Sequence, residues 1–263
     1  MLILLPPSEG KTAPSRGKAM QPEQLSLPSL HGHRAEVLDS LVNLCTTDSP
    51  AGMEKAATVL GLGKTLTAEV EGNARLTTAP SARADRVYTG VLYEALGIGS
   101  LEGPARRRAT TRIAIASGLF GLVRPADRIP AYRLSGDVTL PGIGKVSTFW
   151  SRHLDAAVRE AAGSGLVVDL RSSTYAAFWR PDAETARRVV TMRVLHEVGG
   201  KRKVVSHFNK ATKGRIVRAL LEDGGNPTTP QRFAAHLEQL GWTVEVGEPG
   251  RHGTQVDVVV TDL

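Results

Sequence analysis

The chain has 263 residues, 41% of them hydrophobic and 22% charged, so it can bury a sizeable core and is not generally disordered. A formal net charge of +7 and a pI of about 9.8 favour a polyanionic partner or substrate, although a merely basic protein also fits. Cys45 is the single cysteine, which excludes an intramolecular disulfide. The apolar stretch from Ile113 to Val123 is too short to span a bilayer, so we expect a cytoplasmic protein without a membrane partner.

Strand and helix patterns alternate along the chain. Residues 1–5 are an expected buried strand, residues 8–30 a loop, and residues 31–78 several helices, because apolar residues recur there at helical spacing. Further buried strands are expected at 112–117, 166–170, 188–195 and 203–208. With no repeat and no linker, the pattern predicts one continuous domain over residues 1–263, of mixed α/β (α+β) class.

The C-terminal part has clear boundary signals. Thr229 is expected to cap a helix that has Pro230 in its first position, and Gly241 to end that helix. A hairpin-like pair of strands follows, around 242–246 and 254–261.

The segment from Pro6 to Thr12 follows the first expected strand and ends in Gly-Lys-Thr, as phosphate-binding loops do. A P-loop also needs a glycine where Leu5 stands, and prolines have no amide hydrogen to direct at phosphate, so we reject a P-loop ATPase. Two interpretations stay open. The loop is either solvated, or it holds an anion through Ser8, Gly10, Lys11 and Thr12.

Residues 57–66 place Leu-Gly-Leu-Gly between two expected helices and resemble a helix-hairpin-helix motif. Gly61 and Gly63 would let the turn approach a phosphate backbone, and Lys64 would add positive charge there. An ordinary helix–helix turn with glycine caps fits equally well.

Residues 117–134 follow a strand at the end where open sheets place ligand loops. Residues 105–133 hold seven arginines and a single acid, Asp127. Arg124 and Arg133 offer forked donors suited to phosphate or carboxylate.

Residues 201–218 hold seven lysines and arginines and no acid. The expected helix there buries an apolar stripe, and Lys213 falls on the same side, so it either snorkels to the surface or points into a polar site. We favour the site, and we expect Lys213 to share it with Lys11 and Arg124.

Residues 168–175 run from an apolar strand into Ser-Ser-Thr-Tyr. Asp169 is a candidate for a buried, paired carboxylate, and Ser173 or Tyr175 for ligand contact. A helix cap at Ser172 to Thr174 fits equally well. No metal-ligand cluster stands at metal-site spacing, and we predict no cofactor.

Together these segments resemble the YaaA family of bacterial peroxide-stress proteins, also called DUF328 or UPF0246. The segments that carry the resemblance are Leu4–Thr12, Val87–Val91, Ser117–Leu134, Phe149–Trp150, Asp169–Tyr175, His207–Phe208 and Lys210–Arg215. The resemblance implies a mixed α/β fold with a central basic cleft and a helix-hairpin-helix element. It also implies DNA binding and a role in hydrogen peroxide resistance linked to lower free intracellular iron. No established enzymatic reaction comes with it.

Two hypotheses follow. The leading one is a protein of the peroxide-stress response that binds duplex DNA through a basic cleft and the hairpin. The alternative is an enzyme that acts on a small anionic or nucleotide-like substrate in a cleft formed by the strand-end motifs. No catalytic residue is assigned. The residues expected to bind nucleic acid or an anion are Ser8, Lys11, Thr12, Gly61, Gly63, Lys64, Tyr88, Ser117, Arg124, Tyr132, Arg133, Ser173, Lys210, Lys213 and Arg215.

Overall fold

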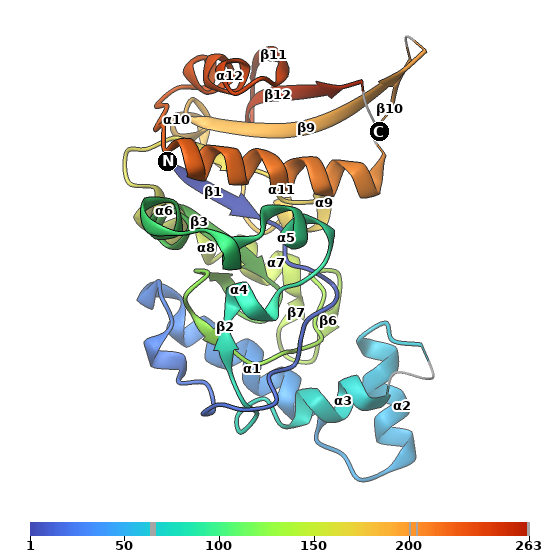
Figure 1. The fold of residues 1–263 in the computed structure, drawn as a ribbon. Coiled ribbons are helices and arrows are strands. Elements are labelled where there is room, and N and C mark those ends of the chain that lie inside the picture. Colours follow the sequence, from blue (N-terminus) through green and yellow to red (C-terminus); the bar gives the residue numbers. More distant parts are fainter. Residues whose placement is uncertain (64–66, 200, 204, 262–263) are drawn as a thin grey trace.

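A central sheet organises the computed structural model, which describes residues 1–63, 67–199, 201–203 and 205–261 (Figure 1). Its eight strands lie in the order β11-β12-β9-β8-β1-β3-β4, with β10 paired to β9. Their bounds are β1 Leu2–Leu5, β3 Ile113–Ser117, β4 Gly121–Val123, β8 Val167–Asp169, β9 Val189–Val198, β10 Lys201–Lys203, β11 Thr243–Gly250 and β12 Gly253–Val260. Two small antiparallel pairs lie outside it: β2 Ala82–Arg83 with β5 Arg128–Ile129, and β6 Thr139–Leu140 with β7 Gly144–Lys145.

The five middle strands, β12, β9, β8, β1 and β3, are mutually parallel. All four residues of β1 and all five of β3 are buried, as expected for parallel strands covered on both faces. The strands predicted at 1–5, 112–117, 166–170 and 188–195 are confirmed.

The strand predicted at 203–208 is wrong. The chain leaves the sheet after β10, and helix α11 begins at Ser206. The β-branched and aromatic residues of this segment indicated a strand, but the apolar stripe of the following helix decides its conformation, because tertiary packing overrides local propensity.

Twelve α-helices and three 3-10 helices occur in the described residues. The α-helices are α1 His31–Cys45, α2 Pro50–Val59, α3 Thr67–Ala74, α4 Ala84–Val87, α5 Val91–Leu96, α6 Gly103–Arg112, α7 Val146–Ser151, α8 Leu154–Ala162, α9 Ser173–Ala176, α10 Ala183–Ala186, α11 Ser206–Asp223 and α12 Pro230–Gln239. The 3-10 helices are η1 Pro22–Gln24, η2 Pro28–Leu30 and η3 Ile98–Ser100. None of the described helices combines the length and the apolar character that a bilayer crossing needs.

The boundary signals of the C-terminal part are confirmed. Thr229 Oγ1 accepts a hydrogen bond from the Arg232 amide, and Gly241 takes a φ of +88° just after α12. Strands β11 and β12 form the expected antiparallel hairpin.

Helix α11 lies along the sheet beside β9 and carries α5 against its other side (Figure 1). A Cβ on Gly214 would sit 2.3 Å from the Leu92 carbonyl oxygen, so only glycine permits this crossing. The crossing fixes the start of α5 and the first turns of α11 next to each other, which positions two walls of the candidate site.

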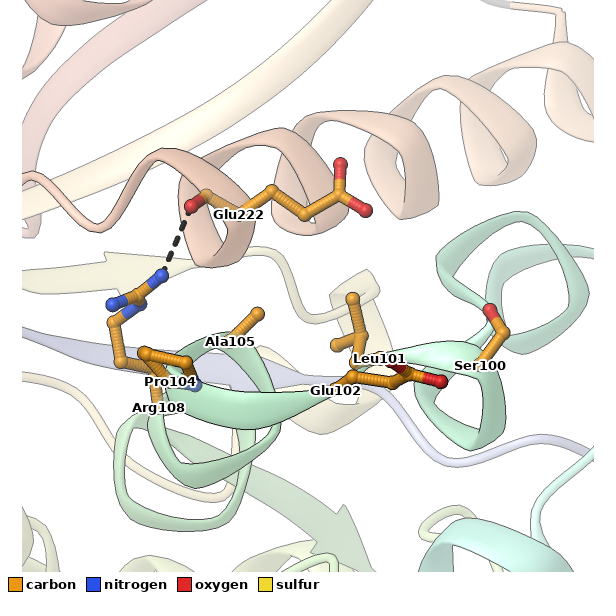
Figure 2. Close-up of a pocket in the computed structure, with 7 residues that line it drawn as sticks. All are labelled: Ser100, Leu101, Glu102, Pro104, Ala105, Arg108 and Glu222. Carbon is orange, nitrogen blue, oxygen red and sulfur yellow. Dashed lines mark hydrogen bonds between the residues drawn. The ribbon is translucent and has the colours of Figure 1, made fainter.

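Six of the seven arginines between residues 105 and 133 donate hydrogen bonds to backbone carbonyl oxygens: Arg106, Arg108, Arg112, Arg124, Arg128 and Arg133. Arg108 and Arg112 bind the carbonyls that end α11, where a helix carries partial negative charge. Figure 2 shows Arg108 beside a shallow pocket between α6 and α11, directed at the Glu222 carbonyl. That pocket lies where α6 packs against α11. Most of the arginines between residues 105 and 133 therefore stabilise the fold.

Candidate functional site

A pocket opens at the carboxyl ends of the central parallel strands. Strand β1 pairs with β3 on one side and β8 on the other, and such switch points are where open α/β sheets bind ligands. The pocket measures about 310 Å³. Its lining comes from the loop after β1, the start of α5, the start of α9 and α11: Pro6, Pro7, Ser8, Glu9, Gly10, Thr89, Gly90, Val91, Leu92, Tyr93, Ser172, Tyr175 and Lys210. We call it the carboxyl-edge pocket.

The loop after β1 is tied to the segment before α5. The Thr89 amide donates to Ser8 Oγ (3.1 Å), and Ser8 Oγ donates to the Gly10 carbonyl. The Thr12 amide donates to the Val87 carbonyl at 2.9 Å. These bonds fix one rim of the pocket. Ser8 lines it, whereas the exposed Thr12 lies outside its lining.

Lys11 lies at the base of this rim. Its Nζ donates to the Ser8 carbonyl at 3.1 Å and stands over the rings of Tyr132 (4.3 Å to the centroid) and Tyr88 (5.8 Å). Burial lowers the pKa of Lys11 to about 8, with Glu9 opposing the shift.

All four tyrosines of the chain gather around this point. The hydroxyls of Ser117, Tyr132 and Tyr88 form a buried chain with links of 2.7 and 2.9 Å. Tyr93 donates from its hydroxyl to the Pro6 carbonyl at 2.6 Å, and Tyr175 lines the pocket. Burial raises the pKa of every one of the four phenols, so they are neutral near pH 7.

A buried ion pair supports the wall formed by the end of β8. Arg171 donates to both carboxylate oxygens of Asp169 (2.9 and 2.7 Å) and to the carbonyls of Tyr175 and Trp179. Burial opposes the charged carboxylate, but the charge and hydrogen bonds of Arg171 outweigh it, so the pKa of Asp169 is lowered. Asp169 is therefore the buried, paired carboxylate that the sequence indicated.

Lys213 reaches the same strand end from α11. Its Nζ donates to the Leu170 carbonyl at 3.3 Å. Burial lowers the pKa of Lys213, and the nearby Asp169 opposes the shift. Lys210 stands one turn earlier on α11, is exposed and lines the pocket. Arg215 is exposed on the same helix, and Ser173 is the exposed first residue of α9.

Two predicted arginines do not join the lysines. Arg124 donates to the carbonyls of Thr111 and Ile113, at the amino end of β3 and therefore opposite Ser117. The expectation that it shares a site with Lys11 and Lys213 is wrong, because its guanidinium is held by the carbonyls where α6 passes into β3. Arg133 lies nearer, but it is paired with the Glu9 carboxylate at 2.8 Å.

Helices α2 and α3 flank the Leu-Gly-Leu-Gly turn as predicted. Gly61 has a φ of +65°, and a Cβ added to Gly61 or Gly63 would have no atom within 4 Å, so both face open space. Gly61 and Arg133 line a common shallow hollow. Lys64 lies outside the described residues, and a helix-hairpin-helix function of this element stays a prediction.

Sequence reasoning missed Tyr93, Thr89 and Arg171. The available signal for Tyr93 was composition. The chain has four tyrosines, and the other three lie in segments that resemble the family, so Tyr93 was also a candidate for the site. Arg171 directly follows a strand that ends in Asp169 and Leu170, and an arginine two residues from a buried aspartate is a natural partner for it.

An open, mostly parallel sheet with a pocket at its carboxyl edge, lined by Lys210, Tyr93 and Tyr175 among others, defines the chain as an α/β protein. A family model described as "Peroxide stress protein YaaA" matches residues 1–245, so the chain belongs to this family. A UPF0246 protein of Streptomyces coelicolor is 49% identical over the full length of both chains. UPF0246 proteins of Corynebacterium efficiens and Corynebacterium glutamicum are 41% and 37% identical, with 98% and 99% of this chain and all of each relative covered.

Proposed function

We propose that the chain binds a small anionic ligand in the carboxyl-edge pocket. The observation that carries the proposal is the group of lysines at this edge of the sheet that make no ion pair. Among the described residues, Lys11 and Lys213 donate only to backbone carbonyls, and Lys210 makes no ion pair. Glu9 and Asp169 act on Lys11 and Lys213 only from beyond ion-pair distance, and cations without an ion pair near a pocket favour an anion there.

The chemistry of the lining supports the same ligand class. Phosphates and carboxylates are bound by lysine ammonium groups together with hydroxyls and backbone amides. The hydroxyl-bearing residues Ser172, Tyr175 and Thr89 line the pocket together with Lys210. Its volume, about 310 Å³, is at the lower end of the range for small-molecule sites, which is roughly 300–1,000 Å³.

Anion titration tests the proposal. We expect inorganic phosphate, pyrophosphate or a nucleoside monophosphate to raise the melting temperature, because ligand at 100 times its Kd stabilises by about 2.7 kcal/mol. For a chain of this size that corresponds to roughly 5–10 °C. Lys213→Met and Lys210→Met should remove the shift while the proteins stay folded.

Lys55→Met is the matched control, because Lys55 is exposed on α2 and outside the pocket. It makes the same chemical change and should leave the shift intact. If no anion stabilises the parent, or if all three variants respond alike, the carboxyl-edge pocket is not an anion site.

DNA binding is the second candidate, and the α2–α3 turn is the observation that favours it. Figure 1 shows α2 and α3 projecting from the end of the molecule away from the central sheet. Gly61 and Gly63 follow α2, and a Cβ added to either would meet no atom within 4 Å. Fluorescence anisotropy with duplex DNA should then show strong salt dependence. With about five phosphates neutralised, log K should fall with log salt at a slope of roughly −4 to −5.

The family description makes peroxide resistance a proposed cellular role, and complementation can assign it to one of the two surfaces. A deletion strain should be sensitive to hydrogen peroxide and be rescued by the parent gene. Lys213→Met should fail to rescue if the pocket is responsible, and a Gly61/Gly63 double substitution should fail if the hairpin is. Immunoblots must show equal protein levels. A deletion strain as resistant to hydrogen peroxide as the parent strain would refute the role in peroxide resistance.

A further inference from the structure

A second cavity lies beside the carboxyl-edge pocket, and Glu9 lines both. The second cavity measures about 590 Å³, and its lining comes from the end of α2, from Arg133 and from the residues that lead into β6. We call it the Arg133 hollow. The two cavities are also linked through α9. Thr174, which directly precedes the pocket residue Tyr175, donates from Oγ1 to the carboxylate of Asp137 in the hollow at 2.9 Å.

The backbone of Arg133 is held in place by the buried Asn73. The Asn73 side chain donates to the Arg133 carbonyl at 2.8 Å and accepts from the Arg133 amide at 2.9 Å. The guanidinium binds Glu9 through Nη1, to the carboxylate at 2.8 Å and to the carbonyl at 3.3 Å. Its Nε and Nη2 make no hydrogen bond to the described residues. Arg108 and Arg124, by contrast, are bound by backbone carbonyls at helix and strand ends.

The Glu9 carboxylate is a partner that a ligand can replace. Its side chain is 64% exposed, and an exposed ion pair contributes about fivefold at most to an equilibrium. The backbone on both sides of Glu9 is fixed, because Ser8 Oγ accepts from the Thr89 amide and the Gly10 carbonyl accepts from both hydroxyls. The carboxylate can therefore rotate away from Arg133 while the loop stays in place.

We infer that the ligand is a small molecule with two anionic groups, one in the carboxyl-edge pocket beside Lys210 and one on Arg133, where it displaces the Glu9 carboxylate. The inference rests on the anion site proposed above. Phosphate and carboxylate both have the oxygen geometry that a guanidinium binds. Asp137, the other acid in the lining of the hollow, is offset by Lys145 at 3.4 Å. Glu9 thus acts as a gate that a ligand with a single anionic group leaves closed.

Two sugar phosphates that differ by one phosphate group test the inference. Isothermal titration calorimetry gives the Kd of fructose 6-phosphate and of fructose 1,6-bisphosphate for the full chain. We expect the bisphosphate to bind the parent about tenfold more tightly, because its bonds to Arg133 outweigh the exposed pair that they replace. Glu9→Gln removes the competing carboxylate and should raise this ratio by a further factor of about three to five. Arg133→Met should bring the two Kd values close together.

A double variant separates the gate from a general effect of charge. Glu9→Gln also removes a negative charge near the pocket, and that effect alone would favour the bisphosphate in any background. If the carboxylate acts through Arg133, Glu9→Gln should not raise the ratio in the Arg133→Met background. A rise as large as in the parent background would overturn the gate. Thermal melts must show that all variants are folded.

Arg107→Met is the matched control, because Arg107 is exposed on α6 and lines neither cavity. It should keep the parent ratio. If inorganic phosphate binds the parent but the bisphosphate binds no more tightly than the monophosphate, the second subsite is overturned and the anion site stays intact. Equal losses of the ratio in Arg133→Met and Arg107→Met would have the same meaning. If none of these anions binds, the anion site itself is refuted.

A short DNA duplex, titrated into the same variants, distinguishes a small ligand from a nucleic-acid backbone. A smaller gain for the duplex than for the bisphosphate in Glu9→Gln supports the small-ligand assignment. A larger gain for the duplex, lost again in the double variant, would assign Arg133 to DNA phosphates and overturn it.

Discussion

Replacing Arg171 with methionine should test the buried pair that supports the pocket wall. The Arg171 side chain is 1% exposed, and methionine keeps most of its apolar stem. The substitution leaves Asp169, whose side chain is 11% exposed, without its partner, and the carbonyls of Tyr175 and Trp179 each lose a donor. Breaking a buried pair from one side costs about 3–5 kcal/mol, which for this chain length lowers the melting temperature by roughly 10 °C.

The sign of the pH dependence is specific to this pair. The pKa of Asp169 is lowered in the folded parent, so its contribution to stability is present above the unfolded pKa and is lost as pH falls through the folded pKa. In the variant, burial still raises the pKa of Asp169 and only the residue 171 amide and Lys213 remain to lower it, so the penalty is relieved as pH falls. The difference in unfolding free energy between parent and variant should therefore be largest at pH 7 and shrink toward pH 4.

Urea unfolding followed by tryptophan fluorescence measures this difference, since the Arg171 guanidinium stands 5.6 Å from the Trp179 ring centroid. The double variant Arg171→Met/Asp169→Asn should recover at least half of the loss, because no charge stays buried and the residue 171 amide can still donate to residue 169. A loss that does not change between pH 7 and pH 4, or a double variant no more stable than Arg171→Met, would refute the coupling.

Three further outcomes are expected from urea unfolding at 25 °C. Lys11→Met should raise the unfolding free energy by up to about 3 kcal/mol at pH 7, because the lowered pKa of about 8 means that the ammonium opposes folding, and the gain should vanish near pH 10.5. Gly214→Ala should cost about 1–3 kcal/mol by overpacking against Leu92, and should weaken anion binding by shifting α5. Gly61→Ala should cost about 1–2 kcal/mol because its φ is +65°, whereas Gly63→Ala should be near neutral, which makes Gly63 the cleaner probe of DNA binding.

Much of the sheet could be predicted from the sequence because its strands are continuous apolar runs. Residues 1–5, 112–117 and 166–170 are mostly apolar, which distinguishes them from loops, and the residues that end each strand stand directly beside it in the sequence. The same local logic failed at 203–208, where β-branched and aromatic residues begin a helix whose apolar stripe lies further along. Long-range packing settled that boundary.

The candidate site was predictable in outline but not in detail. Segments that follow strand ends could be expected to meet at one edge, and Ser8, Tyr175 and Lys210 do line one pocket. The group that an arginine binds could not be predicted from its position after a strand. Arg124 follows a glycine-containing loop, yet it donates to carbonyls at the far end of β3, and only the folded chain reveals which carbonyls lie within its reach.

Arginine and lysine side chains therefore have different roles in this chain. The difference decides how much of the net charge is available to bind a ligand. A guanidinium has several donors in a fixed fork, so it can satisfy helix ends and strand ends while its charge is offset by the local carbonyl dipoles. Arg108, Arg112 and Arg124 are used in this way. A charge of +7 then overstates the field available to a long polyanion. The ammonium groups of Lys11 and Lys213 make no ion pair and bind carbonyls in the segments that follow β1 and β8, at the carboxyl edge of the sheet. The basic character of the chain favours a compact anionic ligand more strongly than an extended one.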